Sequence, residues 1–295
     1  MLAQRLVVGP ILVLTFVGLL LLDLKLGTGA PILAALASVL VARAAWEYCQ
    51  LVNVRTIRTD WRFLAIFGVA TLLANWIPHW TSAGTHAPQF GWPLLVFSLS
   101  LVGLFCKAMY QFETPGATIE TLGAEVLGLA YVAIFTSATA QLRWVWDGEL
   151  LYLPLASVVV ISKCGDIAAY FTGRAIGGAK LCPRLSPGKT IAGGIGAVVG
   201  GTLGGWAWLH WGTLKLTDFQ PGPLSALMLY GVVMSLSGMA GDLAESLIKR
   251  DVSKKDAPAL FPGFGGLLDV LDSVIFCGPI ALLLWTLLPL VRRVE

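Results

Sequence analysis

The chain has 295 residues, of which 57% are hydrophobic and 13% are charged, and its formal net charge at pH 7 is +3. About a quarter of the residues of a soluble domain are charged, so this composition excludes a soluble fold and indicates an integral membrane protein. The small net charge does not point to a partner, whereas the positions of the charges along the chain do carry information.

Nine apolar windows follow one another along the chain, each of about 17 to 25 residues, the length that crosses a hydrocarbon core about 30 Å thick. We therefore expect an all-α, polytopic membrane protein with about nine transmembrane helices. The first window lacks a small-residue cleavage site, so we expect a retained helix and not a signal peptide. The windows lie near residues 5–23, 30–47, 62–78, 91–109, 121–142, 150–172, 190–211, 224–248 and 267–291.

The charges between the windows predict the orientation in the membrane. With the N-terminus in the cytosol, most basic residues fall in inner loops, as the positive-inside rule requires, and tryptophans cluster near the outer ends. Arg292 and Arg293 disagree with this orientation and leave the side of the C-terminus open. We expect one domain, residues 1–295, in the inner membrane, with mainly lipid-facing scaffold helices in 1–142 and catalytic helices and cytosolic loops in 150–291.

The cysteines and histidines do not indicate a site. The five cysteines form no CxxC pair, and their odd number in apolar surroundings argues against a zinc site and against a disulfide framework. The three histidines fall in or beside predicted outer loops, so we do not expect a histidine-based catalytic site. The residues are Cys49, Cys106, Cys164, Cys182, Cys277, His79, His86 and His210.

Several ionisable residues lie inside the late apolar windows, where each costs about 2.5 to 3.5 kcal/mol on insertion scales and usually faces a polar cavity. In the eighth and ninth windows the acids are three residues apart, so each pair shares one face of its helix near the cytosolic end. The residues are Lys163 and Asp166 in the sixth window, Asp242 and Glu245 in the eighth, and Asp269 and Asp272 in the ninth.

Each of these acids also has a plainer explanation. Glu245 and Lys249 have the spacing and order of a surface ion pair on a helix. Acids near a helix N-terminus gain about 0.3 to 1 kcal/mol from the macrodipole, which would account for the pair in the ninth window. Lys163 could serve only to neutralise Asp166, one turn away.

Taken together, the acids predict a metal site. Adjacent carboxylates at membrane depth repel one another and need a counter-charge. A hard cation with oxygen ligands meets that need, and Mg²⁺ in particular binds to one or two carboxylates together with substrate phosphates. The acids therefore predict a phosphate-bearing ligand.

The segment after the sixth window is rich in basic residues and glycine, and it ends where the next helix is expected to start. Backbone N–H groups and the dipole at a helix start favour anions. The tail Gly188-Lys189-Thr190 resembles the end of a Walker A loop, but Pro183 stands where that motif needs glycine and no strand precedes it, which excludes a P-loop. The basic residues, which could also serve only to set the topology, are Arg174, Lys180, Arg184 and Lys189.

Residues 246–272 resemble the C-terminal signature of the CTP-dependent phosphatidate cytidylyltransferase family, the synthases of CDP-diacylglycerol. That signature reads S-x-φ-K-R-x4-K-D-x-small-x2-φ-[PG]-x-H-G-G-φ-x-D-R-φ-D, where φ is apolar, and the match contains no gap. The matching residues are Ser246, Ile248, Lys249, Arg250, Lys255, Asp256, Phe261, Pro262, Gly265, Gly266, Leu267, Asp269, Leu271 and Asp272.

Shorter matches extend the resemblance over most of the chain. Two motifs, D-x-x-A-Y-x-x-G-R and S-P-x-K-T-x-E-G, are matched by Asp166, Tyr170, Gly173 and Arg174 and by Ser186, Pro187, Lys189 and Thr190. The opening QRL and the AAWEYCQL around Glu47 also fit. Four positions depart from the family pattern: Phe264 replaces histidine, Val270 arginine, Pro258 a small residue and Ala192 glutamate.

The resemblance implies transfer of a cytidylyl group from CTP to phosphatidic acid at the cytosolic face, by metal-assisted in-line attack of the lipid phosphate. It implies one or two Mg²⁺ ions as cofactor and CTP, phosphatidic acid and membrane lipids as partners, without nucleic acid, and it leaves a homodimer open. It implies catalytic roles for Asp242, Asp269, Asp272, Lys249 and Arg250, substrate binding by Arg174, Ser186, Lys189, Thr190, Lys255, Asp256, Gly265 and Gly266, and metal binding by Asp242, Glu245, Asp269, Asp272 and Asp166.

Two other functions remain open at this point. A related CTP-using membrane enzyme could act on a polyprenol or on another lipid anion. A cation transporter could use acids in its helices as an ion path, although the acids gather at the predicted cytosolic ends and no inverted repeat is evident.

Overall fold

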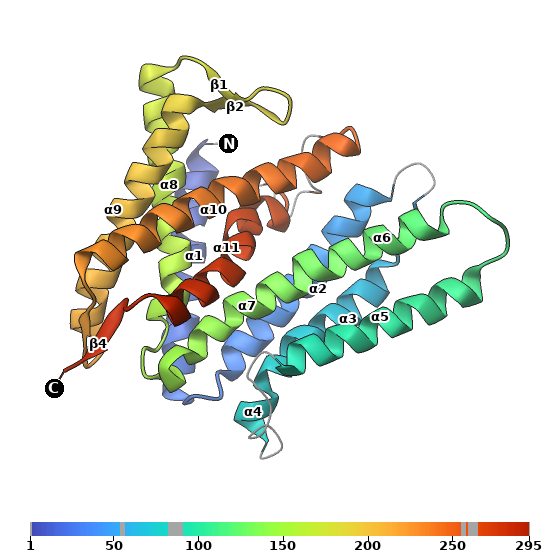
Figure 1. Ribbon diagram of the computed structural model, residues 1–295, viewed down its shortest axis with the longest axis horizontal. Helices are drawn as coiled ribbons and strands as arrows, with labels where there is room; N and C mark the ends of the chain where they lie inside the picture. The colour runs from blue at the N-terminus through green and yellow to red at the C-terminus, as the bar shows by residue number, and fades with distance from the viewer. Residues whose placement is uncertain (1, 54–56, 82–90, 255–257, 259–264, 295) are drawn as a thin grey trace. The chain divides into compact units, whose positions relative to one another are not determined.

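A computed structural model describes residues 2–53, 57–81, 91–254, 258 and 265–294, with side chains from Leu14 onward. Nearly all of it is helical (Figure 1). The elements of the first half are α1 (Leu2–Lys25), α2 (Pro31–Val52), α3 (Trp61–Leu73), the 3-10 turn η1 (Ala74–Trp76), α4 (Ile77–Trp80), α5 (Gly91–Gln111), α6 (Thr118–Leu129), the π-helical turn η3 (Ala130–Ile134) and α7 (Phe135–Gln141).

Four short strands accompany the helices in the described residues of the second half. Its elements are the 3-10 segment η4 (Leu142–Gly148), α8 (Leu153–Ile176), β1 (Lys180–Cys182), β2 (Ser186–Thr190), α9 (Ile191–Leu216), β3 (Phe219–Pro221), α10 (Leu224–Asp251), α11 (Leu267–Leu287) and β4 (Val291–Arg293).

The prediction of an all-α, multi-pass membrane protein is confirmed. Each of the nine apolar windows coincides with a helix or a run of helices, and seven spans in the described part are long and apolar enough to cross a membrane. Helices α1 and α9 are not among these seven. In α9, eight of the 26 residues are glycine, which contributes no apolar side chain.

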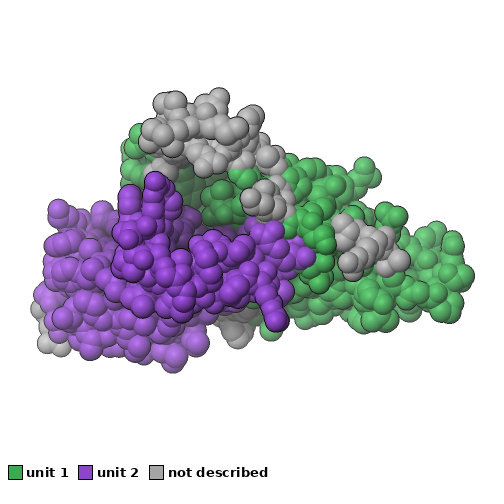
Figure 2. Space-filling view, turned by 90° about the horizontal axis from the view of Figure 1, so that it is seen from above, with its two compact units in different colours: residues 1–140, 251–270 green, residues 141–250, 271–295 purple. Residues whose placement is uncertain are grey.

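The chain forms two compact units (Figure 2). The first unit contains residues 1–140 and 251–270, and the second contains residues 141–250 and 271–295. Helix α11 therefore begins in the first unit and continues into the second, and Asp269 and Asp272 are assigned to different units.

In the first unit, α2, α3, α5 and α6 lie side by side (Figure 1). Small residues of α2, such as Ala37 and Ala44, recur at helical spacing on its buried face and allow close packing. Gly128 of α6 lies directly against Tyr48, since a Cβ at this glycine would stand 2.5 Å from the ring, and the Tyr48 hydroxyl donates to the carbonyl of Ala124 (2.8 Å).

In the second unit, α8 and α9 pack against each other along their length (Figure 1). The contact depends on glycines four residues apart, a spacing that lets two membrane helices approach closely. A Cβ on Gly196 would stand 2.0 Å from Thr172 Oγ1, and one on Gly200 would stand 2.3 Å from Ala168 Cβ. This packing brings the end of α8 to the start of α9.

The basic segment after α8, expected as a loop, is partly a β-hairpin. Strands β1 and β2 are antiparallel, with Lys180 opposite Thr190 and Cys182 opposite Ser186. Pro187 is tolerated because a two-stranded sheet consists only of edge strands. As the sequence predicts, the segment ends at a helix start, since α9 follows directly at Ile191.

Candidate functional site

A cavity of about 420 Å³ lies in the second unit among α8, β2, α9 and α10. Its wall combines two carboxylates, two bases and several glycines. The polar residues are Asp166, Tyr170 and Arg174 of α8, Lys189 and Thr190 of β2, and Asp242 of α10. Residues from both short family-like motifs thus meet in one cavity.

Helix α8 supplies one polar face to this cavity. Asp166, Tyr170 and Arg174 are four residues apart, a spacing that places them on the same side of the helix. Arg174 donates from a guanidinium nitrogen to the Tyr170 hydroxyl (2.8 Å). Lys163 and Asp166 form the expected ion pair (3.0 Å), but about half of each side chain is exposed, which leaves the carboxylate open to a ligand.

The start of α9 forms a second wall. Thr190 caps the helix, because its hydroxyl oxygen accepts a hydrogen bond from the Gly193 N–H (3.0 Å). Gly193 also lies against α8, where a Cβ would stand 3.1 Å from the Ala169 carbonyl oxygen. Helix starts favour anions, and Gly193 and Gly194 leave the backbone there accessible to a ligand in the cavity.

An ion pair joins the hairpin to α10. Lys189 Nζ lies 2.5 Å from Asp242 Oδ2, and both side chains are partly exposed. Nearby, Arg250 Nε donates to the Leu185 carbonyl in the hairpin turn (3.2 Å). The two contacts hold the hairpin against the C-terminal half of α10, and Lys189 lines the cavity.

Helices α10 and α11 cross next to Asp242. A Cβ on Gly241 would stand 2.7 Å from Phe276 Cβ and 3.0 Å from the Asp272 carbonyl oxygen. Asp272 is buried, and its carboxylate accepts hydrogen bonds from the backbone N–H (2.5 Å) and the hydroxyl (2.8 Å) of Ser273. The crossing therefore brings one predicted metal-binding acid from each helix into the same region.

Glu245 and Lys249 form the ion pair that their spacing predicts (2.6 Å), but Glu245 is buried and Lys249 is only partly exposed, so the pair is not a surface pair. Neither residue is among the described residues that line the cavity. The pair therefore does not form part of the described cavity wall.

Asp269 belongs to the first unit and caps its own helix. Its Oδ2 accepts a hydrogen bond from the Gly266 N–H (2.8 Å), which agrees with the helix N-terminus explanation of this acid. A Cβ on Gly265 would stand 2.3 Å from the same oxygen, so this glycine leaves room for the carboxylate.

The structure leaves part of the predicted site untested. Lys255 and Asp256, predicted to bind substrate, lie outside the described residues, as does Phe264. Ser186 is half-buried in β2 and Arg250 is exposed at the end of α10. The predicted residues that the cavity brings together are Asp166, Arg174, Lys189, Thr190 and Asp242.

The carboxylates of the site fit a cation that takes some of its ligands from the protein and the others from a substrate. Among the described residues, no three His, Cys, Asp or Glu side chains gather closely enough to hold a metal without other ligands. Mg²⁺ seldom needs such a cage, because it typically uses one or two carboxylates together with waters and phosphate oxygens. Asp242, with Asp272 near it, is such a set.

The sequence did not lead us to predict the glycines of the cavity wall. Gly193, Gly194 and Gly238 line it, together with the side chains of Leu181 and Met239. A pair of glycines in the first turn after a Lys-Thr pair is a signal that could have indicated close approach of a ligand to a helix start.

Comparison with known proteins identifies similar sequences over most of the chain. The sequence profile of the cytidylyltransferase family matches residues 3–288. The chain is 28% identical to the uncharacterized protein YnbB of Escherichia coli K12 over 225 residues, 68% of this chain and 71% of YnbB. It is 42% identical to the phosphatidate cytidylyltransferase of Brucella suis over 196 residues (63% and 69% of the two chains) and 28% identical to that of Synechocystis over 264 residues (79% and 81%).

Proposed function

The chain belongs to the cytidylyltransferase family, and we propose that it transfers the cytidylyl group of CTP to phosphatidic acid, forming CDP-diacylglycerol and pyrophosphate. The similar proteins of Brucella suis and Synechocystis are phosphatidate cytidylyltransferases. The predicted resemblance to that family is confirmed by these matches.

The observation that carries the proposal is the composition of the cavity wall. Asp166 and Asp242 supply negative charge, Arg174 and Lys189 supply positive charge, and a helix start adds N–H groups. A nucleoside triphosphate with a divalent cation has the complementary pattern of charges. The cavity of about 420 Å³ has the volume of a small-molecule site.

The reaction needs no protein nucleophile. An oxygen of the lipid phosphate, already ionised near neutral pH, attacks the α-phosphorus of CTP. The bond from that phosphorus to the bridging oxygen breaks, and pyrophosphate leaves with the electron pair. Catalysis then consists of positioning and charge neutralisation, the usual contributions of a protein to phosphoryl-type transfer.

The bases of the site serve to bind and orient the phosphates. Lys189 and Arg174 line the cavity and would contact the triphosphate, while Lys249 and Arg250, at the end of α10, would act on the lipid phosphate. The Lys189–Asp242 ion pair must open for Lys189 to contact a phosphate and for Asp242 to bind a cation.

Magnesium is the cofactor that fits these residues. Asp242 and Asp272 would hold it, with Asp166 and Glu245 as further ligands or as hydrogen-bond partners of the ligands. Asp269 stays a ligand predicted from its sequence motif alone. Bound at the site, magnesium would neutralise charge on the phosphate oxygens. One or two such ions are compatible with this set of acids.

We also propose nine spans, with the site at the cytosolic face of the inner membrane. Helices α1 and α9 have 24 and 26 residues, enough to span a bilayer, and α9 packs along the whole of α8. The basic residues of the α8–α9 hairpin and of the end of α10 favour a cytosolic position for this end of the second unit. Labelling of single cysteines introduced in the hairpin, from either side of intact vesicles, tests the orientation.

The direct test is release of pyrophosphate from CTP by the purified protein, with and without phosphatidic acid and Mg²⁺. Release that requires both supports the proposal. Release with a polyprenol phosphate or another lipid anion, and none with phosphatidic acid, would transfer the same chemistry to a different lipid. No turnover of CTP with any lipid would contradict it.

A further inference from the structure

A buried carboxylate at the end of α2 contacts the signature helix α11. Glu47 is fully buried, and its Oε1 accepts a hydrogen bond from Arg43 Nε (2.8 Å) in an ion pair. Its Oε2 accepts a hydrogen bond from the backbone N–H of Leu268 (2.9 Å), 221 residues later in the chain. All three residues belong to the first unit.

Leu268 is the second residue of α11, so its N–H is one of the donors that the helix itself cannot pair. A carboxylate at a helix N-terminus pairs such a donor and interacts favourably with the helix dipole. Because Arg43 neutralises the charge of Glu47, the free-energy cost of burying this carboxylate is lower than that of burying an unpaired one.

A second contact ties the same end of α2 to the same segment. Lys254 Nζ donates to the carbonyl oxygens of Gln50 (2.5 Å) and Leu51 (3.4 Å), in the last turn of α2. Carbonyls at a helix C-terminus lack partners within the helix and favour a cation. The end of α2 thus contacts Lys254 and Leu268, which lie on either side of residues 255–267 in the sequence of the signature segment.

We propose that Glu47 is a positioning residue that sets the direction of Asp269 through the first turn of α11. The hydrogen bond to Leu268 fixes the backbone one residue before Asp269, and the Asp269 carboxylate in turn accepts from the Gly266 N–H. Loss of the Glu47 contact frees this turn and misplaces the carboxylate. The inference rests on the proposed catalytic role of Asp269.

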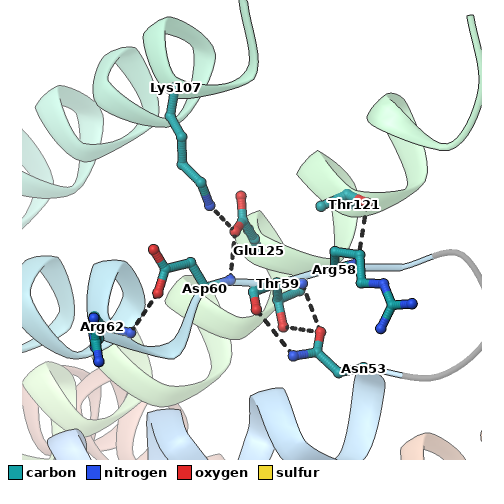
Figure 3. Close-up of polar contacts among 8 residues, drawn as sticks. All are labelled: Asn53, Arg58, Thr59, Asp60, Arg62, Lys107, Thr121 and Glu125. Atoms are coloured by element: carbon teal, nitrogen blue, oxygen red, sulfur yellow. Dashed lines mark hydrogen bonds and ion pairs between the residues drawn. The ribbon is translucent and has the colours of Figure 1, made fainter. Parts of the chain in front are cut away.

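The first unit contains a matched control (Figure 3). Glu125 is also buried, pairs with the Lys107 ammonium, and accepts from the backbone N–H of Asp60 (3.0 Å). Asp60 is the N-cap of α3, so Glu125 has the same chemistry as Glu47 at a different helix start. Helix α3 carries none of the proposed site residues.

The experiment compares Glu47→Ala with Glu125→Ala in the full-length protein in detergent. It measures kcat, the KM for CTP, the thermal midpoint, and amide exchange at the starts of α11 and α3. We expect Glu47→Ala to lower kcat about 10- to 100-fold, the usual loss for a residue that supports a ligand, with little change in the KM for CTP. Exchange at Leu268 is then faster in Glu47→Ala alone.

Glu125→Ala should speed exchange at the start of α3 and lower the thermal midpoint without lowering kcat. Glu47→Gln keeps an acceptor for the Leu268 N–H and should have a kcat between those of Glu47→Ala and the wild type. If Glu47→Ala does not fold, Glu47→Gln is compared with Glu125→Gln, and the proposal still requires a lower kcat and faster exchange at Leu268.

A wild-type kcat in Glu47→Ala overturns the proposal, as does an equal loss of kcat in Glu125→Ala. Asp269→Asn, measured in parallel, separates the two ideas. An active Asp269→Asn removes the proposed role of Asp269 itself. An inactive Asp269→Asn beside a fully active Glu47→Ala removes only the role of Glu47.

Discussion

The Lys189 ammonium lies 2.5 Å from the Asp242 carboxylate, so β2 and α10 each supply one member of an ion pair in the cavity wall. The two residues are proposed to bind opposite charges, Lys189 a phosphate and Asp242 a cation. A triphosphate with its bound cation offers both charges: the phosphate can pair with Lys189 and the cation with Asp242, so neither side chain is left unpaired when the substrate binds.

Lys189→Met should lower kcat/KM for CTP roughly 10- to 100-fold, as expected for a lost hydrogen bond to a charged group, which is worth about 1.5 to 3 kcal/mol. The measurement is the initial rate of pyrophosphate release as a function of CTP concentration. Lys215→Met, at the other end of α9, is the control and should leave the rate unchanged. Equal rates in the two variants would remove Lys189 from the site.

Asp242→Asn should reduce kcat by a factor on the order of 10² to 10³, the usual cost of removing one stabilising group from a preorganised site. It should also raise the Mg²⁺ concentration needed for half-maximal rate, which titration of Mg²⁺ into metal-free protein measures. Asp218→Asn, between α9 and β3, serves as the control. An unchanged Mg²⁺ dependence would argue against Asp242 as a ligand.

Gly265→Ala should lower kcat with little loss of stability. The added methyl group would stand 2.3 Å from Asp269 Oδ2, and a carboxylate at the end of a side chain moves at small cost to the fold. Gly116→Ala, where a Cβ would meet nothing within 4 Å, is the matched control for rate and thermal midpoint. A variant as active as the control would show that the position of this carboxylate is unimportant.

Gly200→Ala should destabilise the second unit by about 1 to 3 kcal/mol, because overpacking of a close contact forces its neighbours apart. The new methyl group would stand 2.3 Å from Ala168 Cβ in the contact of α8 with α9. Gly123→Ala on α6 has no neighbour within 4 Å and should be neutral or slightly stabilising. Thermal unfolding in detergent distinguishes the two, and equal midpoints would contradict a packing role for Gly200.

Much of the fold followed from local pattern. The length and apolarity of each window predicted a helix, and each window is helical, because a bilayer imposes these properties on every span separately. The hairpin between α8 and α9 was missed, since its basic residues and glycines read equally well as a loop.

In the candidate site, too, contacts within one helix were predictable from the sequence, and contacts that depend on other helices were not. The pairing of Lys163 with Asp166 and of Glu245 with Lys249 was predictable, because residues three and four apart on a helix always lie near each other. Burial of the second pair was not, since it depends on neighbouring helices that the spacing does not specify.

The sequence by itself determined the membrane class, the helices and the family. The first two depend on the apolarity of each segment, and the family depends on motifs whose residues follow one another along the chain. Tertiary structure alone decided that Asp242 pairs with Lys189 and that Glu47 pairs with the Leu268 N–H. Such contacts join residues from 53 to 221 positions apart, and they form only where close packing of small residues brings the helices and their termini together.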